Sequence, residues 1–216
     1  IGYLLQRGIL NYTLGDDLLP PLLVTFGLSI VVQNVLLEVF SADSQRLKAG
    51  DLETSNIELI EGLSIGIFPF IIFIVAVFMI IGLQLLFNYT RLGRAFRATS
   101  DDATTAQLMG INHKHVFALA MGLAMVLVGI AGVLMAVRSN FDPSIGPTKL
   151  LYAFEAVIMG GLGSLWGTLI GGIILGVAQN IGAKIDPGWQ ILAGHIAFLI
   201  VLVIKPNGLF PRTKDE

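Results

Sequence analysis

The chain has 216 residues, of which 55% are hydrophobic and only 13% are charged. A soluble domain carries about a quarter charged residues, so this chain lacks the polar side chains to cover a surface in water. The formal net charge of −2 excludes the basic footprint of a nucleic-acid-binding protein. The absence of cysteine excludes disulfides, thiolate metal sites and cysteine nucleophiles. The composition therefore predicts a protein of the lipid bilayer with no nucleic-acid partner.

Apolar runs long enough to cross a bilayer divide the chain. A membrane-spanning helix needs about 20 apolar residues, and none of the runs alternates as a barrel strand would. The runs cover residues 22–40, 63–87, 116–137 and 189–204, the last with Trp189 and Lys205 at its two interfaces. Glycines at 160–164 break a further apolar stretch into two short segments, 151–159 and 167–181. The sequence predicts an all-α, polytopic transmembrane helical bundle that forms one domain over residues 1–216.

Basic residues fix the orientation of the spans, because Lys and Arg near span ends stay on the cytoplasmic side. Segment 88–115 carries three arginines and a lysine, and we expect it to be cytoplasmic. Segment 41–62 has five carboxylates against two basic residues, which indicates the outer side. A basic tail after residue 204 is also expected inside, and this requires an odd number of crossings after residue 137, for which three suffice. The two short segments and the last span supply them; a re-entrant pair with an extracellular tail is the alternative.

The cytoplasmic segment 88–115 is expected to form two short helices. We expect Ser100 to cap the second, over residues 101–109, and Gly110 with Asn112 to end it. Its small apolar face consists of Ala103, Ala106, Leu108 and Met109. Such a helix is either a solvated connector or an element that docks into a groove of a partner protein, and the pattern alone does not separate the two.

Five further sequence features point to a known family. They are residues 25–34 (TFGLSIVVQN), the loop 92–112 with its LGRA and LMGIN ends, residues 129–133 (GIAGV), 160–167 (GGLGSLWG) and 205–212 (KPNGLFPR). In this order they resemble the branched-chain amino acid permeases of bacterial ABC importers, and residues 25–34 point to the H-type subunit. The chain begins at Ile1 rather than Met and is shorter than members of this family, so we expect its first few spans to be missing.

The resemblance implies a transport subunit, not an enzyme, that moves leucine, isoleucine, valine or a similar substrate. The chain has no Gly-x-x-x-x-Gly-Lys-Ser/Thr element to cradle phosphates, which agrees with ATP hydrolysis elsewhere. The implied partners are a second permease subunit, two cytoplasmic ATPases that carry ATP and Mg²⁺, and an extracellular or periplasmic binding protein. We expect no cofactor on this chain and a multi-pass location in the bacterial inner membrane.

The resemblance also gives the cytoplasmic loop a role in coupling. Residues 94–111 would fit into a cleft of the ATPase, whose closure would push the loop helix and tilt the neighbouring spans. The residues implied to couple are Gly93, Arg94, Arg97, Asp101, Ala106, Leu108, Gly110 and Ile111.

Glu155 is the sharpest candidate for the substrate path, because ionisable groups at membrane depth are costly unless paired or wetted. It precedes the glycine break, where a discontinuous helix can face a water-filled cavity. Its carboxylate could meet the ammonium group of an amino acid, or pair with Lys149 or Arg138.

Other polar residues in the spans divide between path and packing. Gln33 and Asn34, on the span that Thr25 opens, could also line the path. We expect His195 to make a hydrogen bond between helices rather than to transfer protons or bind a metal, and no metal site is predicted. Glycines at three- and four-residue intervals in 122–132 and 167–176 are typical of closely packed membrane helices.

Three other functions stay open at this point. A urea or short-amide importer would use the same architecture with a smaller cavity. An autonomous channel would conduct without any ATPase. A membrane enzyme would have only Glu155 and His195 to work with.

Overall fold

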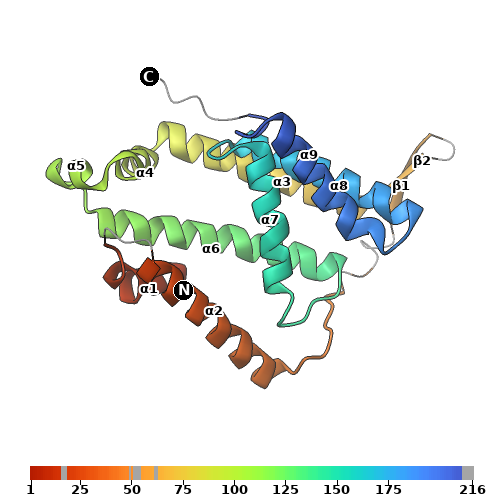
Figure 1. Ribbon diagram of the computed structural model, residues 1–216, viewed down its shortest axis with the longest axis horizontal. Coiled ribbons are helices and arrows are strands. Elements are labelled where there is room, and N and C mark those ends of the chain that lie inside the picture. The colour runs from red at the N-terminus through yellow and green to blue at the C-terminus, as the bar shows by residue number, and fades with distance from the viewer. Residues whose placement is uncertain (16–18, 49, 51–54, 61–62, 211–216) are drawn as a thin grey trace. The chain divides into compact units, whose positions relative to one another are not determined.

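The computed structural model describes residues 1–15, 19–48, 50, 55–60 and 63–210. These residues are almost entirely helical, which confirms the predicted all-α polytopic bundle. The helices are α1 Gly2–Gly8, the 3-10 helix η1 Leu10–Tyr12, α2 Leu19–Phe40, α3 Ile67–Tyr89, α4 Arg91–Asp101, α5 Ala103–Leu108, α6 His113–Arg138, α7 Gly146–Gly160, α8 Leu165–Ile185 and α9 Trp189–Ile204. They fall into two compact units, Ile1–Ser144 and Ile145–Glu216 (Figure 1).

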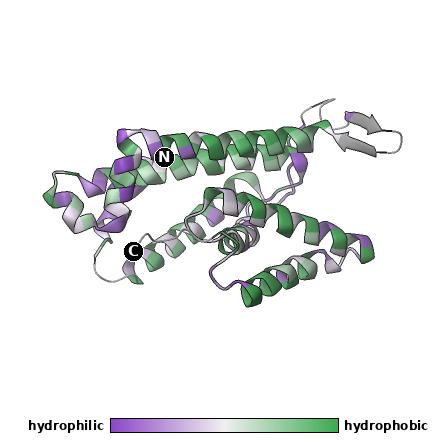
Figure 2. Cartoon of the chain, turned by 90° about the horizontal axis from the view of Figure 1, so that it is seen from above, coloured by the Kyte–Doolittle hydropathy of each residue, from purple (hydrophilic) through white to green (hydrophobic). Residues whose placement is uncertain are grey.

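Four of the described helices, α2, α3, α6 and α8, are long and apolar enough to cross a membrane, and α9 is apolar but shorter. Figure 2 shows hydrophobic residues along the long helices and hydrophilic ones gathered near α1, α4 and α5. Helix α8 has 21 residues and is therefore no short segment. It begins early because the Ser164 hydroxyl caps it, accepting the Gly167 N–H at 3.0 Å. The chain is a multi-pass membrane protein.

Residues 63–66 form a strand rather than the first turn of a span. Strand β1, Asn56–Ile60, pairs antiparallel with β2, Leu63–Gly66. Both segments carry β-branched isoleucines, which favour a strand, and hydropathy alone does not distinguish a strand from a helix. Helix α3 therefore begins at Ile67, with Pro69 in its first turn, where a missing N–H costs nothing.

Helix α6 organises the first unit, because α1, α3, α4 and α5 all contact it. At its N-terminal end the Tyr3 hydroxyl lies 2.9 Å from His115 Nδ1, and the Asn11 amide donates to the Lys114 carbonyl at 3.2 Å. Beyond its other end, the backbones of Gln45 and Phe141 exchange hydrogen bonds of 2.8 and 2.9 Å. The segments that follow α2 and α6 therefore lie together, as expected if both helices run in the same direction.

The second unit consists of α7, α8, α9 and the segment after α9. Glycines let α7 and α8 approach closely, because a Cβ atom on Gly160, Gly167 or Gly171 would collide with the backbone of the facing helix. After α9 the chain returns to the glycine break. The N–H groups of Leu209 and Phe210 donate to the carbonyls of Met159 and Gly160 at 2.9 and 3.0 Å. We call this the tail contact; it satisfies carbonyls that the end of α7 leaves open.

Candidate functional site

The polar loop between α3 and α6 folds as two short capped helices, α4 and α5, and the cap of α5 differs from the predicted one. Helix α4 starts after Thr90, whose hydroxyl accepts the Gly93 N–H at 3.0 Å. Helix α5 is capped by Asp102, not by Ser100, which lies inside α4. Asp102 is the N-cap of α5 because its carboxylate accepts the N–H groups of Thr104 and Thr105, at 2.8 and 3.0 Å.

These hydrogen bonds also set the charge of Asp102. The side-chain hydrogen bond from Thr105, followed by the backbone N–H donors of Thr105 and Thr104, lowers the pKa of the Asp102 carboxyl below its ordinary value of 3.8. The carboxylate is therefore fully ionised at neutral pH and holds a fixed negative charge at the start of α5.

Some of the residues implied to couple point inward and hold the loop together. Gly93 packs so tightly on the backbone of Leu86 and Phe87 that no Cβ atom fits. The Arg97 guanidinium donates to the Phe87 carbonyl at 2.8 Å. Ala106 is 4% exposed. Gly93 and Arg97 thereby tie the loop to the last turn of α3, and Ala106 is buried within the fold.

Other residues of the same set form an exposed tip. Leu108 is 83% exposed and the neighbouring Met109 80%. Gly110 turns the chain with a φ of +83°, and the Ile111 N–H donates to the Ala106 carbonyl at 3.0 Å, which closes the end of α5. We call Leu108–Gly110 the coupling tip. Arg94 and Asp101 are exposed on α4.

A polar hollow lies beside the coupling tip. It is lined by Gln107, Gly110, Ile111, Asn112, His113 and Lys114, where α5 passes into α6. Asn112 caps α6 by accepting the His115 N–H at 3.1 Å rather than ending the preceding helix. The sequence did not predict a site at His113 or Lys114, because their position at the edge of a span indicates only an interface and, for Lys114, the orientation of the spans.

The three candidates on α2 do not share a face. Nine residues separate Thr25 from Asn34, so at 3.6 residues per turn they lie about 180° apart on the helix. The Thr25 hydroxyl donates to the Pro21 carbonyl at 2.9 Å, and the Asn34 amide donates to the Ile30 carbonyl at 2.8 Å. Both are exposed and bonded to their own helix, while Gln33 is half-buried. A single path along α2 cannot be lined by all three.

In the second unit, Glu155 on α7 pairs with His195 on α9. Glu155 Oε1 and His195 Nδ1 form a hydrogen-bonded ion pair when the imidazole is protonated. The predicted hydrogen bond of His195 between helices is therefore present, and the partner of Glu155 is neither Lys149 nor Arg138. Lys149 Nζ instead lies 5.9 Å from the centre of the Tyr152 ring.

Two buried polar atoms in or near this pair have no hydrogen-bond partner in the described part of the chain. Glu155 is 5% exposed, and its second oxygen, Oε2, is buried without a hydrogen bond in the described part of the chain. The same holds for Nε2 of Gln179 on α8, which packs against Gly194. The Tyr152 ring stacks on the His195 ring, with centroids 6.1 Å apart. No group of three potential metal ligands occurs among the described residues.

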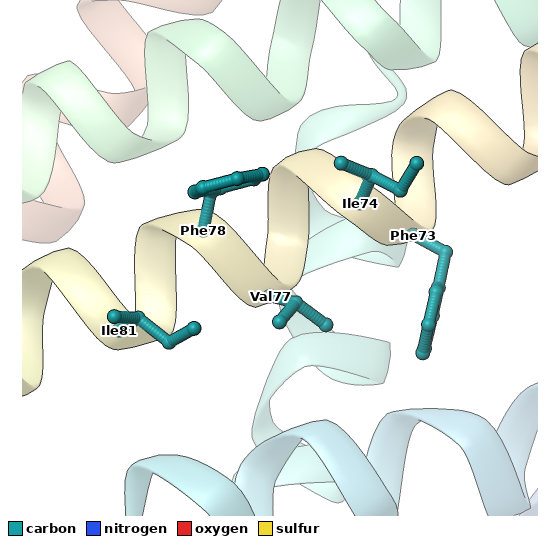
Figure 3. Close-up of a pocket in the computed structure, with 5 residues that line it drawn as sticks. All are labelled: Phe73, Ile74, Val77, Phe78 and Ile81. Carbon is teal, nitrogen blue, oxygen red and sulfur yellow. The ribbon is translucent and has the colours of Figure 1, made fainter.

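An apolar hollow on α3 provides no such polar groups. Figure 3 shows the five side chains that line it, Phe73, Ile74, Val77, Phe78 and Ile81, all rising from one helix. A site for an amino acid needs polar groups to meet the charged ends, so this surface is not a candidate.

The long apolar helices, with a capped polar loop between α3 and α6, define a multi-pass membrane protein. The chain belongs to the family described as the permease component of the branched-chain amino acid transport system, which matches residues 9–204. No solved structure matches it.

Curated relatives carry the same description. The high-affinity branched-chain amino acid transport system permease protein BraD of Pseudomonas aeruginosa is 32% identical over 100% of this chain and 71% of its own length. The permease protein LivH of Escherichia coli is 33% identical over 68% of this chain and 48% of its own length. LivM of the same organism is 25% identical over 58% of this chain and 30% of its own length. The chain thus spans about half the length of LivH, less than a third of LivM and 71% of BraD.

Proposed function

We propose that the chain is a permease subunit of an ATP-driven importer that carries branched-chain or closely similar amino acids through a bacterial inner membrane. The membership of the family and the names of BraD and LivH support the class of substrate. The four long apolar helices provide the membrane domain. The chain itself provides the path for the amino acid, and the free energy comes from hydrolysis of ATP, bound with Mg²⁺ on separate subunits.

The proposed assembly contains a second permease, two ATPases and a binding protein that delivers the amino acid. The similarity to both LivH and LivM, two permease proteins of one organism, supports a pair of related but different permeases.

The observation that carries the coupling proposal is the coupling tip. A solvated connector has no need to expose two large apolar side chains, yet Leu108 and Met109 are 83% and 80% exposed at the end of a capped helix. The loop behind them is held rigidly by Gly93 and Arg97 on the last turn of α3. A push on the tip would therefore reach α3 and α6, which join α4 and α5 to the membrane.

The test introduces a charge at the coupling tip and measures transport by the complete importer reconstituted in proteoliposomes. We expect Leu108→Glu to leave assembly and basal ATP hydrolysis intact but to reduce ATP-dependent uptake of radiolabelled leucine at least tenfold, since an apolar contact with the ATPase is replaced by a buried charge. The matched control is Leu92→Glu, because Leu92 is also exposed, at 46%, but lies on α4 away from the tip. Normal uptake by the Leu108 variant would make the loop a mere connector.

The substrate is tested on the cognate binding protein, which selects first. Tight binding of leucine, isoleucine or valine is expected, and binding of urea or a short amide instead would replace this substrate by the second candidate. Uptake by the isolated polypeptide, without ATPases, would indicate a channel.

A further inference from the structure

The carboxylate of Glu155 is enclosed in the second unit with only half of its hydrogen bonds made. Its side chain is 6% exposed, and one oxygen bonds His195 while the other has no partner in the described chain. An unpaired carboxyl group inside a bundle is costly, and His195 is the hydrogen-bond partner that Glu155 has in the described chain. Removal of His195 without a replacement leaves the buried carboxyl group with no partner there.

The two partners differ in their freedom to move. The side chain of His195 is 32% exposed, about five times more than that of Glu155. The preceding residue, Gly194, has no side chain, and its place is taken by Gln179 from α8. The His195 ring also stacks on the Tyr152 ring, and its hydrogen bond to Glu155 is the side-chain hydrogen bond it makes in the described chain. The imidazole is thus the accessible and replaceable member of the pair.

A substitute for the imidazolium must be a cation with N–H donors. The ammonium group of a zwitterionic amino acid has the same charge and three donors. It could therefore bond Glu155 Oε1 and also the oxygen that His195 leaves unsatisfied. An uncharged amide offers donors but no compensating charge, so it would not release His195 from Glu155.

We propose that His195 is an internal stand-in for the ammonium group of the transported amino acid: it neutralises Glu155 while the permease is empty, and the substrate ammonium replaces it during passage. The proposal rests on the proposed function for the class of substrate. It makes Glu155 the substrate-contacting residue and His195 a positioning residue that competes with the substrate.

The experiment measures ligand-induced thermal stabilisation of the assembled importer in nanodiscs, with millimolar L-leucine as the probe. His195→Ala should lower the melting temperature of the empty complex, because Glu155 loses its counter-charge. Leucine should then raise the melting temperature of this variant more than it raises that of the unchanged protein. The difference between the two rises should be about 3 °C or more at tenfold excess over the dissociation constant. The double variant with Glu155→Gln should show no leucine effect.

Two controls separate this exchange from simpler causes. The first is 4-methylpentanoate, which has the side chain and carboxylate of leucine but no ammonium group, and should not stabilise the His195 variant. The second is Asn180→Ala. Asn180 neighbours Gln179, and its amide donates to the Gly176 carbonyl of its own helix at 2.8 Å, so this variant should behave as the unchanged protein. If His195→Ala does not assemble, His195→Asn retains one donor without the charge and serves in its place.

Equal stabilisation by 4-methylpentanoate and leucine, or a leucine effect that survives Glu155→Gln, would overturn the proposal. So would a His195 variant that leucine does not stabilise. None of these outcomes depends on transport, so the importer function can stand while the exchange fails. If the unchanged importer took up no leucine while the stabilisation experiment gave the expected result, the proposed function would instead be contradicted.

Discussion

Asp102 shows how one side chain can decide where a helix begins. Two good caps, Ser100 and Asp102, stand two residues apart, and the sequence pattern gave the wrong one. The carboxylate accepts two backbone N–H groups and the Thr105 hydroxyl, whereas Ser100 remains in the last turn of α4. A pattern search weighs residue types, but the choice depends on where the preceding helix stops.

The lowered pKa of Asp102 predicts an acid-sensitive α5. A carboxyl whose pKa is lowered in the folded state stabilises the fold above its unfolded pKa and loses this contribution as the pH falls through its folded pKa. We therefore expect amide-exchange protection of residues 103–108 to be full at neutral pH and to decline below about pH 4.

The comparison for this prediction is Asp102→Asn, since Asn caps helices about as well but does not ionise in this range. The protection ratio between the two proteins should be constant near pH 7 and fall on acidification, as measured by hydrogen exchange and mass spectrometry. Asp101→Asn should follow the unchanged protein. A protection ratio that does not vary with pH would show that ionisation of the Asp102 carboxyl does not stabilise α5.

Glu155 marks the limit of prediction at the residue scale. The sequence identified it as a buried ionisable group and left its partner open between a substrate and two nearby bases. The actual partner, His195, is 40 residues further along the chain, on another helix. No local spacing indicates that pair, because it exists only once α7 and α9 meet.

At the scale of elements, apolar runs predicted the helices well, since burial of apolar residues in lipid decides their existence. The ends were less predictable. The run 63–87 included strand β2, and the segment 167–181 fell short of α8 at both ends. The glycine pattern was also only partly informative: Gly167 and Gly171 contact α7, whereas Gly129, Gly132, Gly172 and Gly176 face open space within the described chain.

The tail contact predicts a strong effect at a glycine outside every helix. Gly208 has a φ of +83°, and a Cβ atom there would collide with Gly161 and the Ile158 carbonyl. We expect Gly208→Val to destabilise the second unit by about 2 kcal/mol or more and to lower the melting temperature of the purified protein by about 4–8 °C.

The matched control for the tail contact is Gly172→Ala, because a Cβ atom on Gly172 meets nothing within 4 Å. This change should leave the melting temperature the same or raise it slightly, since Ala favours helix more than Gly. Equal melting temperatures for the Gly208 variant and the unchanged protein would show that the tail does not hold the glycine break.

For the whole molecule, the lack of cysteine makes the orientation directly testable. Any cysteine introduced into the chain is its only thiol. We expect Asp101→Cys and Lys205→Cys to react with a membrane-impermeant maleimide only from the cytoplasmic side, and Asp43→Cys and Gln190→Cys only from the outside. All four positions are exposed, so access of the reagent depends on the side of the membrane.

The outcomes separate the coupling proposal from the topology of the second unit. Labelling of residue 101 from outside would overturn the coupling proposal. Labelling of residue 205 from outside would place the tail on the outer face, contradict the three crossings expected after α6, and leave the coupling tip unaffected. Maleimide reaction is scored on intact cells and on inverted vesicles, with permeabilised cells as the control for reactivity.

The tail contact also constrains the order of events during synthesis. Residues 208–210 leave the ribosome after α7, α8 and α9, yet they supply the N–H groups that satisfy the end of α7. Until translation has passed α9, the carbonyls of Met159 and Gly160 therefore lack these hydrogen bonds or bond water or the insertion machinery instead. The second unit is complete only after its last helix has entered the bilayer.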